Sequence, residues 1–160
     1  MPIRSATPAD LAAILALERR SGTAGHWQRV QYQALFEPSA PPRIALLAEE
    51  ESTLLGFLIA RPTGADWELE NLVVAAGARR RGLGTRLLNQ LFALLRRPGG
   101  QALFLEVRES NAAARALYEN CGFVAVGRRQ HYYQEPWEDA VMYRLILGEK
   151  LAPPPPDLAP

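Results

Sequence analysis

The sequence contains a single cysteine, Cys121, among its 160 residues. An intramolecular disulfide needs two thiols, so this composition favours a reducing compartment, and we expect a cytoplasmic protein. Cys121 lies at the end of an apolar helical pattern, which is more typical of a small buried side chain than of a nucleophile. The two histidines, His26 and His131, are far apart in the chain. Metal-ligand spacing is therefore absent, and we expect no bound metal.

Long apolar runs and an excess of one charge are missing as well. The chain has no run of 18 apolar residues and no signal-peptide pattern at its start, so we expect no membrane segment. Its 18 Lys and Arg nearly balance its 17 Asp and Glu, and the net charge of +1 argues against a nucleic-acid-binding protein. A hydrophobic content of 48% predicts one globular domain, which we place over residues 1–148. The prolines at 153–156 predict an extended, disordered tail over residues 149–160.

Hydrophobic periodicity predicts a mixed α/β fold. A run of strands followed by strand–helix–strand units implies a mixed sheet with helices on both faces. Asn111 is the predicted N-cap of the last helix, and Gly122 is its C-terminal glycine. The predicted strands cover residues 3–6, 43–49, 54–61, 67–75, 101–107, 123–133 and 140–147, and the predicted helices run from residue 8 to before Gly22 and over residues 27–36, 82–97 and 112–121.

A glycine-rich turn separates one predicted strand from the helix after it. The turn reads Arg79-Arg80-Arg81-Gly82-Leu83-Gly84-Thr85, and the strand before it contains Leu72-Val73-Val74. Unpaired N–H groups and the positive end of the helix dipole make such a helix start a seat for phosphate, and arginine side chains add donors. The turn lacks the Lys-Ser/Thr of a P-loop, and Leu87 stands where a Rossmann loop has its third glycine. These residues predict a site for a pyrophosphate-bearing cofactor of another kind.

The Arg-x-x-Gly-x-Gly pattern resembles the pyrophosphate loop of the GCN5-related N-acetyltransferases, which bind acetyl-CoA. A second segment, residues 102–123, resembles the last strand–helix unit of that superfamily, and most closely the bacterial ribosomal-protein-alanine N-acetyltransferases known as RimI. It carries Leu-Glu-Val-Arg, Ser-Asn-Ala-Ala-Ala, Ala-Leu-Tyr-Glu and Gly-Phe in the same order and spacing. The resemblance covers residues 1–147, strongly after residue 70. It implies a mixed, mostly antiparallel sheet of about seven strands with about four helices on its two faces.

The resemblance also implies roles for individual residues. Glu106 of Leu-Glu-Val-Arg corresponds to the family's general base, which acts directly or through water. Tyr118 of Ala-Leu-Tyr-Glu corresponds to the acid that protonates the departing CoA thiolate. Asn111 is expected to touch the cofactor as well as cap its helix, and the backbone N–H groups of Leu72-Val73-Val74 are expected to hold the developing oxyanion.

Each catalytic assignment has a structural alternative. Glu106 could pair with Arg108 or with another arginine at the strand end. Tyr118 could be a buried aromatic residue whose hydroxyl is hydrogen-bonded within the core. Glu70, in the strand before the loop, is a rival base or a solvated strand residue.

The acceptor of the acetyl group is indicated by weaker signals. Tyr132 and Tyr133, the Glu138-Asp139 pair and the loop around Trp27 resemble elements that border the peptide groove of RimI-like enzymes. They imply a protein N-terminal amine, such as that of a ribosomal protein, with Glu70 or the acidic pair favouring a cationic group. The alternative for these residues is that they pair the last two strands and cap the sheet.

The chain departs from the RimI pattern before the second helix. It reads Ala24-Gly25-His26-Trp27 where the family has an aromatic-Pro-Trp element. A small amine or amino acid therefore stays open as the acceptor. A catalytically silent acyl-CoA-binding module is a third alternative, but the presence of both Glu106 and Tyr118 counts against it.

Overall fold

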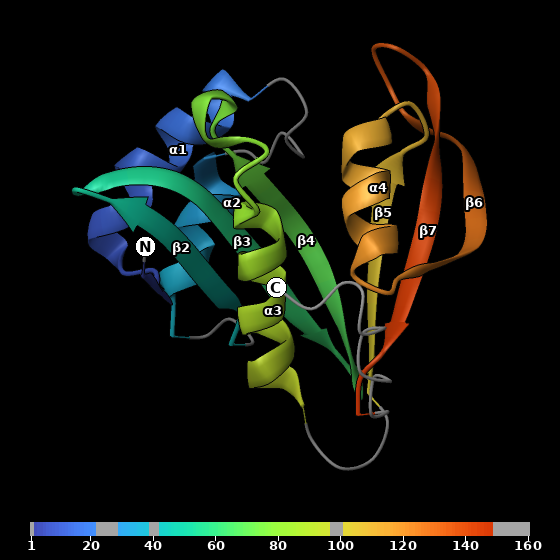
Figure 1. The fold of residues 1–160 in the computed structure, drawn as a ribbon, viewed down its shortest axis with the longest axis horizontal. Helices are drawn as coiled ribbons and strands as arrows, with labels where there is room; N and C mark the ends of the chain where they lie inside the picture. The colour runs from blue at the N-terminus through green and yellow to red at the C-terminus, as the bar shows by residue number, and fades with distance from the viewer. Residues whose placement is uncertain (1, 22–28, 39–41, 97–100, 149–160) are drawn as a thin grey trace.

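The computed structural model of the chain describes residues 2–21, 29–38, 42–96 and 101–148 (Figure 1). Gly22, Trp27 and the proline-rich tail lie outside the described residues. The strands are β1 (Ile3–Ser5), β2 (Ile44–Glu50), β3 (Thr53–Thr63), β4 (Asp66–Val74), β5 (Ala102–Arg108), β6 (Val124–Tyr133) and β7 (Glu138–Ile146). The helices are α1 (Leu11–Arg20), α2 (Arg29–Gln33), α3 (Leu83–Leu95) and α4 (Ala112–Asn120), with short 3₁₀ turns at Pro8–Asp10, Ala34–Phe36 and Ala76–Ala78.

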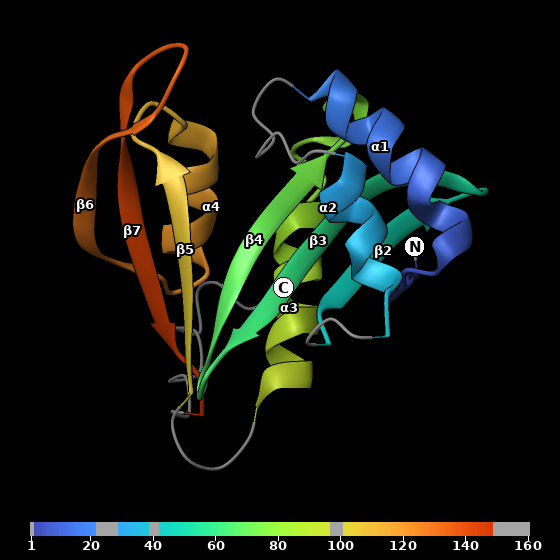
Figure 2. The same cartoon turned by 180° about the vertical axis from the view of Figure 1, so that it is seen from behind.

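All seven strands form one sheet in the order β1-β2-β3-β4-β5-β7-β6. Every neighbouring pair is antiparallel except β4 and β5, which are parallel. Helices α3 and α4 cover one face of the sheet, and α1 and α2 cover the other face over β2 and β3 (Figures 1 and 2). The predicted mixed sheet with helices on both faces is confirmed.

Two apolar cores lie on the two faces of the sheet. The larger one joins the buried stripe of α3 to inward-facing residues of the strands and to Tyr118 and Phe123. In α3 this stripe recurs at helical spacing, because the adjacent Leu87 and Leu88 are fully buried and so is Leu91, one turn further along. The smaller core packs α1 and α2 on Phe57 and its neighbours.

A β-bulge at Glu70 reverses the alternation of side chains along β4. Ile59 of β3 lies opposite Asn71, and Ala60 lies opposite Leu69, so Glu70 is the extra residue. Leu69 accordingly packs in the larger core, beneath α3. Asn71 instead donates a hydrogen bond from Nδ2 to the hydroxyl of Tyr32, in the smaller core, at 2.9 Å. Glu70 and Asn71 therefore both face the side of the sheet that carries α1 and α2.

Strands β4 and β5 are joined at one end only. They pair at Trp67–Leu103 and Glu68–Phe104 and then diverge toward their carboxyl ends (Figures 1 and 2). Within the part of the chain that the structure describes, the edge of β4 beyond Glu68 that faces β5 has no strand partner. This split leaves backbone hydrogen-bonding groups on that edge of β4 without a partner in the sheet.

Candidate active site

The glycine-rich turn leads directly into α3. Gly82 has φ +73°, a conformation that L residues rarely adopt, and a Cβ built on it would meet no atom within 4 Å. The first helical hydrogen bond runs from the Arg86 N–H to the Gly82 carbonyl at 3.0 Å. The N–H groups of Leu83, Gly84 and Thr85 therefore have no acceptor inside the helix. Open space at Gly82 and free N–H groups at the helix start fit the predicted pyrophosphate site.

Gly84 has a second role that the motif does not indicate. A Cβ on Gly84 would lie 2.8 Å from Leu117 Cδ2, so a glycine lets the first turn of α3 approach α4 closely. The Thr85 hydroxyl donates a hydrogen bond to the Cys121 thiol at the end of the same helix. Burial raises the pKa of that half-buried thiol. Cys121 packs against the larger core, as expected of a small apolar side chain.

The three arginines of the turn are exposed on its surface. Arg81 contacts Glu50 at 3.3 Å, and the Nε of Arg79 donates to the Val74 carbonyl at 3.4 Å. Both contacts are at the surface and are weak because water and salt screen them. Arg80 has φ +63° and forms no ion pair among the described residues. The guanidinium groups can therefore turn toward a phosphate at little cost.

Tyr118 lies in the core beneath α4, with its ring against Phe123 at 5.6 Å and Tyr143 at 6.2 Å between centroids. Burial raises the pKa of its phenol far above the ordinary value, and repulsion from Tyr133 and Cys121 adds to the shift. No group in the described ranges forms a hydrogen bond with the Tyr118 hydroxyl. Tyr118 is therefore a protonated donor without an internal acceptor, which differs from the ordinary buried tyrosine of the structural alternative.

Glu106 lies on β5 just beyond the last β4–β5 pair, where the strands separate. Leu105 and Val107 face the larger core, on the side of the sheet that carries α3 and α4. Glu106, between them in the strand, therefore points to the opposite face of the sheet. Its Oε1 contacts the Nε of Arg129 at 2.7 Å, and the side chain is 20% exposed. Burial and the neighbouring Glu106 raise the pKa of Tyr132. The ion pair with an arginine that the structural alternative expects is therefore present, and its partner is Arg129 of β6 rather than Arg108.

Arg108 is occupied elsewhere. Its guanidinium contacts Glu138 at 3.4 Å and stacks over the Tyr133 ring at 4.4 Å. Burial and the neighbouring Tyr132 and Glu106 raise the pKa of Tyr133 to about 12. The two tyrosines and Glu138 thus line the same corner as Glu106. Glu106 is one of the charged groups that raise the pKa of Tyr133, and Tyr133 contributes in turn to the raised pKa of Tyr118.

Glu70 is held by two arginines on the far side of the split. Arg43 contacts it at 2.8 Å and Arg61 at 3.3 Å, and its side chain is 8% exposed. A carboxylate paired twice is poorly placed to receive a proton or to attract a cationic acceptor. Glu70 is therefore neither the solvated strand residue of the structural alternative nor a favourable base.

Asn111 caps α4 as the sequence predicts, since its Oδ1 accepts a hydrogen bond from the Ala114 N–H at 3.2 Å. On β4, Leu72 and Val74 pack toward the α3 core and Val73 toward the α1–α2 core. Their backbone lies beyond the last pair of β4 with β5 and so borders the split. Trp27, the remaining predicted substrate residue, lies outside the described residues.

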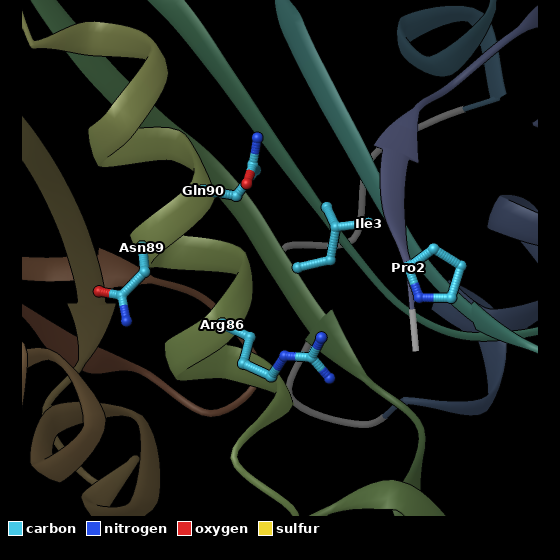
Figure 3. Close-up of a pocket in the computed structure, with 5 residues that line it drawn as sticks. All are labelled: Pro2, Ile3, Arg86, Asn89 and Gln90. Atoms are coloured by element: carbon cyan, nitrogen blue, oxygen red, sulfur yellow. The ribbon is translucent and has the colours of Figure 1, made fainter.

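A separate hollow lies between α3 and β1. It has a volume of about 380 Å³ and is lined by Pro2, Ile3, Arg86, Asn89 and Gln90 (Figure 3). It contains no carboxylate, phenol or thiol, and it shares no residue with the predicted site. Among the described residues there is also no group of three metal-binding side chains and no helix long and apolar enough to span a membrane.

Comparison with known proteins agrees with this geometry. The family model of the GNAT acetyltransferases matches residues 11–123. The ribosomal protein bS18-alanine N-acetyltransferase of Salmonella typhimurium is 34% identical over 141 residues, which are 87% of this chain and 93% of that protein. The N-alpha-acetyltransferase RimI of Mycobacterium tuberculosis is 33% identical over 117 residues, 71% of this chain and 72% of that protein.

A solved structure points to the same family. The crystal structure of the ribosomal-protein-S18-alanine N-acetyltransferase from Escherichia coli superposes with a TM-score of 0.80 at 30% identity, covering 94% of this chain and 98% of that one. The chain therefore belongs to the GNAT family of acetyltransferases. It is an acetyl-CoA-dependent N-acetyltransferase, which confirms the co-substrate that the resemblance implies.

Proposed function

We propose that this enzyme acetylates the N-terminal α-amine of a protein, such as a ribosomal protein whose first residue is alanine. The observation that carries the proposal is the arrangement around the split between β4 and β5. A protonated phenol, Tyr118, lies on the α3–α4 side, and a carboxylate, Glu106, lies on the opposite side. Acetyl-CoA and the acceptor amine can therefore approach the split from opposite faces of the sheet.

The donor side is built by the start of α3. The N–H groups of Leu83, Gly84 and Thr85, with the arginines beside them, would hold the pyrophosphate. Asn111, at the start of α4, would touch the same cofactor. Acetyl-CoA supplies a thioester, which is an acyl group already activated toward amines.

The remaining chemistry is done by the protein. The β4 backbone around Leu72-Val73-Val74 would donate hydrogen bonds to the carbonyl oxygen as negative charge develops on it. Glu106 would take the proton of the attacking amine, directly or through one water. Tyr118 would give its proton to the departing sulfur. Holding amine and thioester next to each other supplies a large part of the acceleration, and no covalent enzyme intermediate is needed.

The acceptor side favours a peptide. Tyr132 is 49% exposed and Tyr133 lies beside it with ring centroids 5.0 Å apart, so the two rings form an aromatic wall next to Glu106. Such a wall can hold an extended chain by its backbone and side chains. A free α-amine also suits a carboxylate base, because its pKa of roughly 7.7–8.0 lies far below that of a lysine amine, near 10.4.

An acceptor screen tests the proposal. Purified protein and acetyl-CoA are incubated with short peptides that begin with alanine, free lysine, polyamines and aminoglycosides, and thiol release is followed. We expect the alanine peptides to be acetylated much faster than any small amine. Efficient acetylation of a small amine with no activity on peptides would assign the enzyme to small-molecule acetylation, an acceptor class that the departure at residues 24–27 keeps open. No thiol release with any amine would leave a silent acyl-CoA-binding module.

A further inference from the structure

Arg129 reaches Glu106 across an intervening strand. In the order β5-β7-β6, strand β7 separates the two residues, with Ala140 opposite Arg129 and Met142 opposite Glu106. The Nε of Arg129 nonetheless lies 2.7 Å from Glu106 Oε1. The side chain therefore crosses β7 to end on the carboxylate that we assign as the base.

The side chains that lie over Glu106, those of Arg129 and Tyr132, are exposed enough to change conformation. Arg129 is 54% exposed, and its guanidinium lies 5.5 Å from the ring of Tyr132, which is also half-exposed. Both residues stand on β6, where the pairing with β7 is irregular between Arg129 and Tyr133. Water reaches the half-exposed Arg129 end of this ion pair and screens it, so releasing Arg129 requires little free energy.

An acceptor amine needs the place that Arg129 occupies. A direct base must come within roughly 2.6–3.2 Å of the atom whose proton it takes. The Nε of Arg129 already satisfies that distance, as an ammonium group would. Three other arginines on this face are held by other carboxylates: Arg108 by Glu138, and Arg43 and Arg61 by Glu70.

We propose that Arg129 sets the affinity of the site for its acceptor by competing with the acceptor's ammonium group for the Glu106 carboxylate. The inference rests on the proposed acetyl transfer, with Glu106 receiving the amine. The competitor is part of the enzyme, so weakly held cations do not displace it. An acceptor displaces it only with additional contacts, which a peptide finds on Tyr132 and Tyr133. Small cationic amines lack those contacts and are disfavoured.

Steady-state kinetics with saturating acetyl-CoA test the proposal. Arg129→Gln should lower the KM for an alanine peptide roughly two- to fivefold, the range for an exposed ion pair, with kcat unchanged. Arg129→Lys keeps the charge, and its KM for the alanine peptide should lie between those of Arg129→Gln and the parent. Arg128→Gln is the matched control, because Arg128 neighbours Arg129 but pairs with Glu109 and Asp139. Added salt should narrow the difference between parent and Arg129→Gln, since it screens the ion pair.

Two kinetic results would overturn the proposal. One is a KM for Arg129→Gln equal to that of Arg128→Gln. The other is a lower kcat at unchanged KM, as expected for Glu106→Gln, because Arg129 would then orient the carboxylate rather than compete for it.

Calorimetry separates this inference from the proposed function. The alanine peptide is titrated onto each variant saturated with CoA, where no turnover occurs. If the parent acetylates no amine, the proposed function fails. The competition still predicts tighter peptide binding by Arg129→Gln than by Arg128→Gln. Equal affinities, or no binding by either variant, would overturn it.

Discussion

Replacing Tyr118 by phenylalanine should separate catalysis from stability. The residue is buried, and its hydroxyl forms no hydrogen bond among the described residues, so removing the hydroxyl breaks no internal hydrogen bond. The melting temperature and the acetyl-CoA affinity should stay close to those of the parent. Turnover should fall, because general acid catalysis contributes about 10²–10⁴-fold, or roughly 2.7–5.4 kcal/mol in the barrier.

Tyr143→Phe is the matched control, since its ring packs against Tyr118. The Tyr143 hydroxyl donates to Glu119 Oε1 at 2.7 Å and accepts from Arg115 Nε at 3.0 Å. Losing both hydrogen bonds should cost about 1–2 kcal/mol of stability. That cost lowers the melting temperature of a domain of this size by roughly 2–8 °C. Turnover of the folded variant should remain near that of the parent.

Thermal unfolding and thiol-release kinetics of both variants show whether the Tyr118 hydroxyl has a catalytic or a structural role. The raised pKa of Tyr118 adds a pH criterion, because a phenol held protonated should cause no loss of turnover up to about pH 10. If Tyr118→Phe turns over at the parent rate, Tyr118 is not the acid. If it unfolds as early as Tyr143→Phe, the hydroxyl has a structural partner and the reasoning from its burial is wrong.

Other variants test the remaining parts of the site and the fold. Gly82→Ala should lose most of the thermal stabilisation by acetyl-CoA, whereas Gly64→Ala, with a similar φ of +68° and equally open space, should lose only intrinsic stability. Glu106→Gln should lower turnover at neutral pH and recover part of it above about pH 8, where an α-amine is already neutral; equal loss at every pH would argue against a base. Arg4→Gln should destabilise the protein at neutral pH, because Arg4 lowers the pKa of Asp10. A carboxyl group whose pKa is lowered by folding stabilises the folded protein at neutral pH, and this stabilisation is lost as the pH falls. The free energies of unfolding of parent and variant, measured by urea titration, should therefore converge between about pH 5 and pH 2.

The donor side of the site could be predicted from the sequence because it is encoded locally. The turn at residues 79–85, the apolar stripe of α3 and the Asn111 cap each depend on residues within one or two helical turns. Strand and helix positions in the structure accordingly lie within a few residues of the predicted ones. The tight approach of Gly84 to Leu117 was missed, since a motif does not report which helix packs against it.

The acceptor side depends on contacts between distant strands. The contact of Arg129 with Glu106 requires the order β5-β7-β6, which periodicity does not specify. The bulge at Glu70 has a faint signal in the two adjacent polar residues, Glu70 and Asn71, between Leu69 and Leu72. Alternation alone would place Glu70 and Asn71 on opposite faces, and it would miss the Asn71–Tyr32 hydrogen bond.

The most direct test of the proposed function uses one peptide that carries both an N-terminal alanine and an internal lysine. The enzyme acetylates it with acetyl-CoA at neutral pH, and fragmentation mass spectrometry locates the acetyl group. The arrangement of Glu106, Tyr132 and Tyr133 at the split predicts that the group lies on the α-nitrogen of alanine and that an N-terminally blocked peptide is inert. Acetylation of the lysine ε-nitrogen at a comparable rate in the blocked peptide would contradict it.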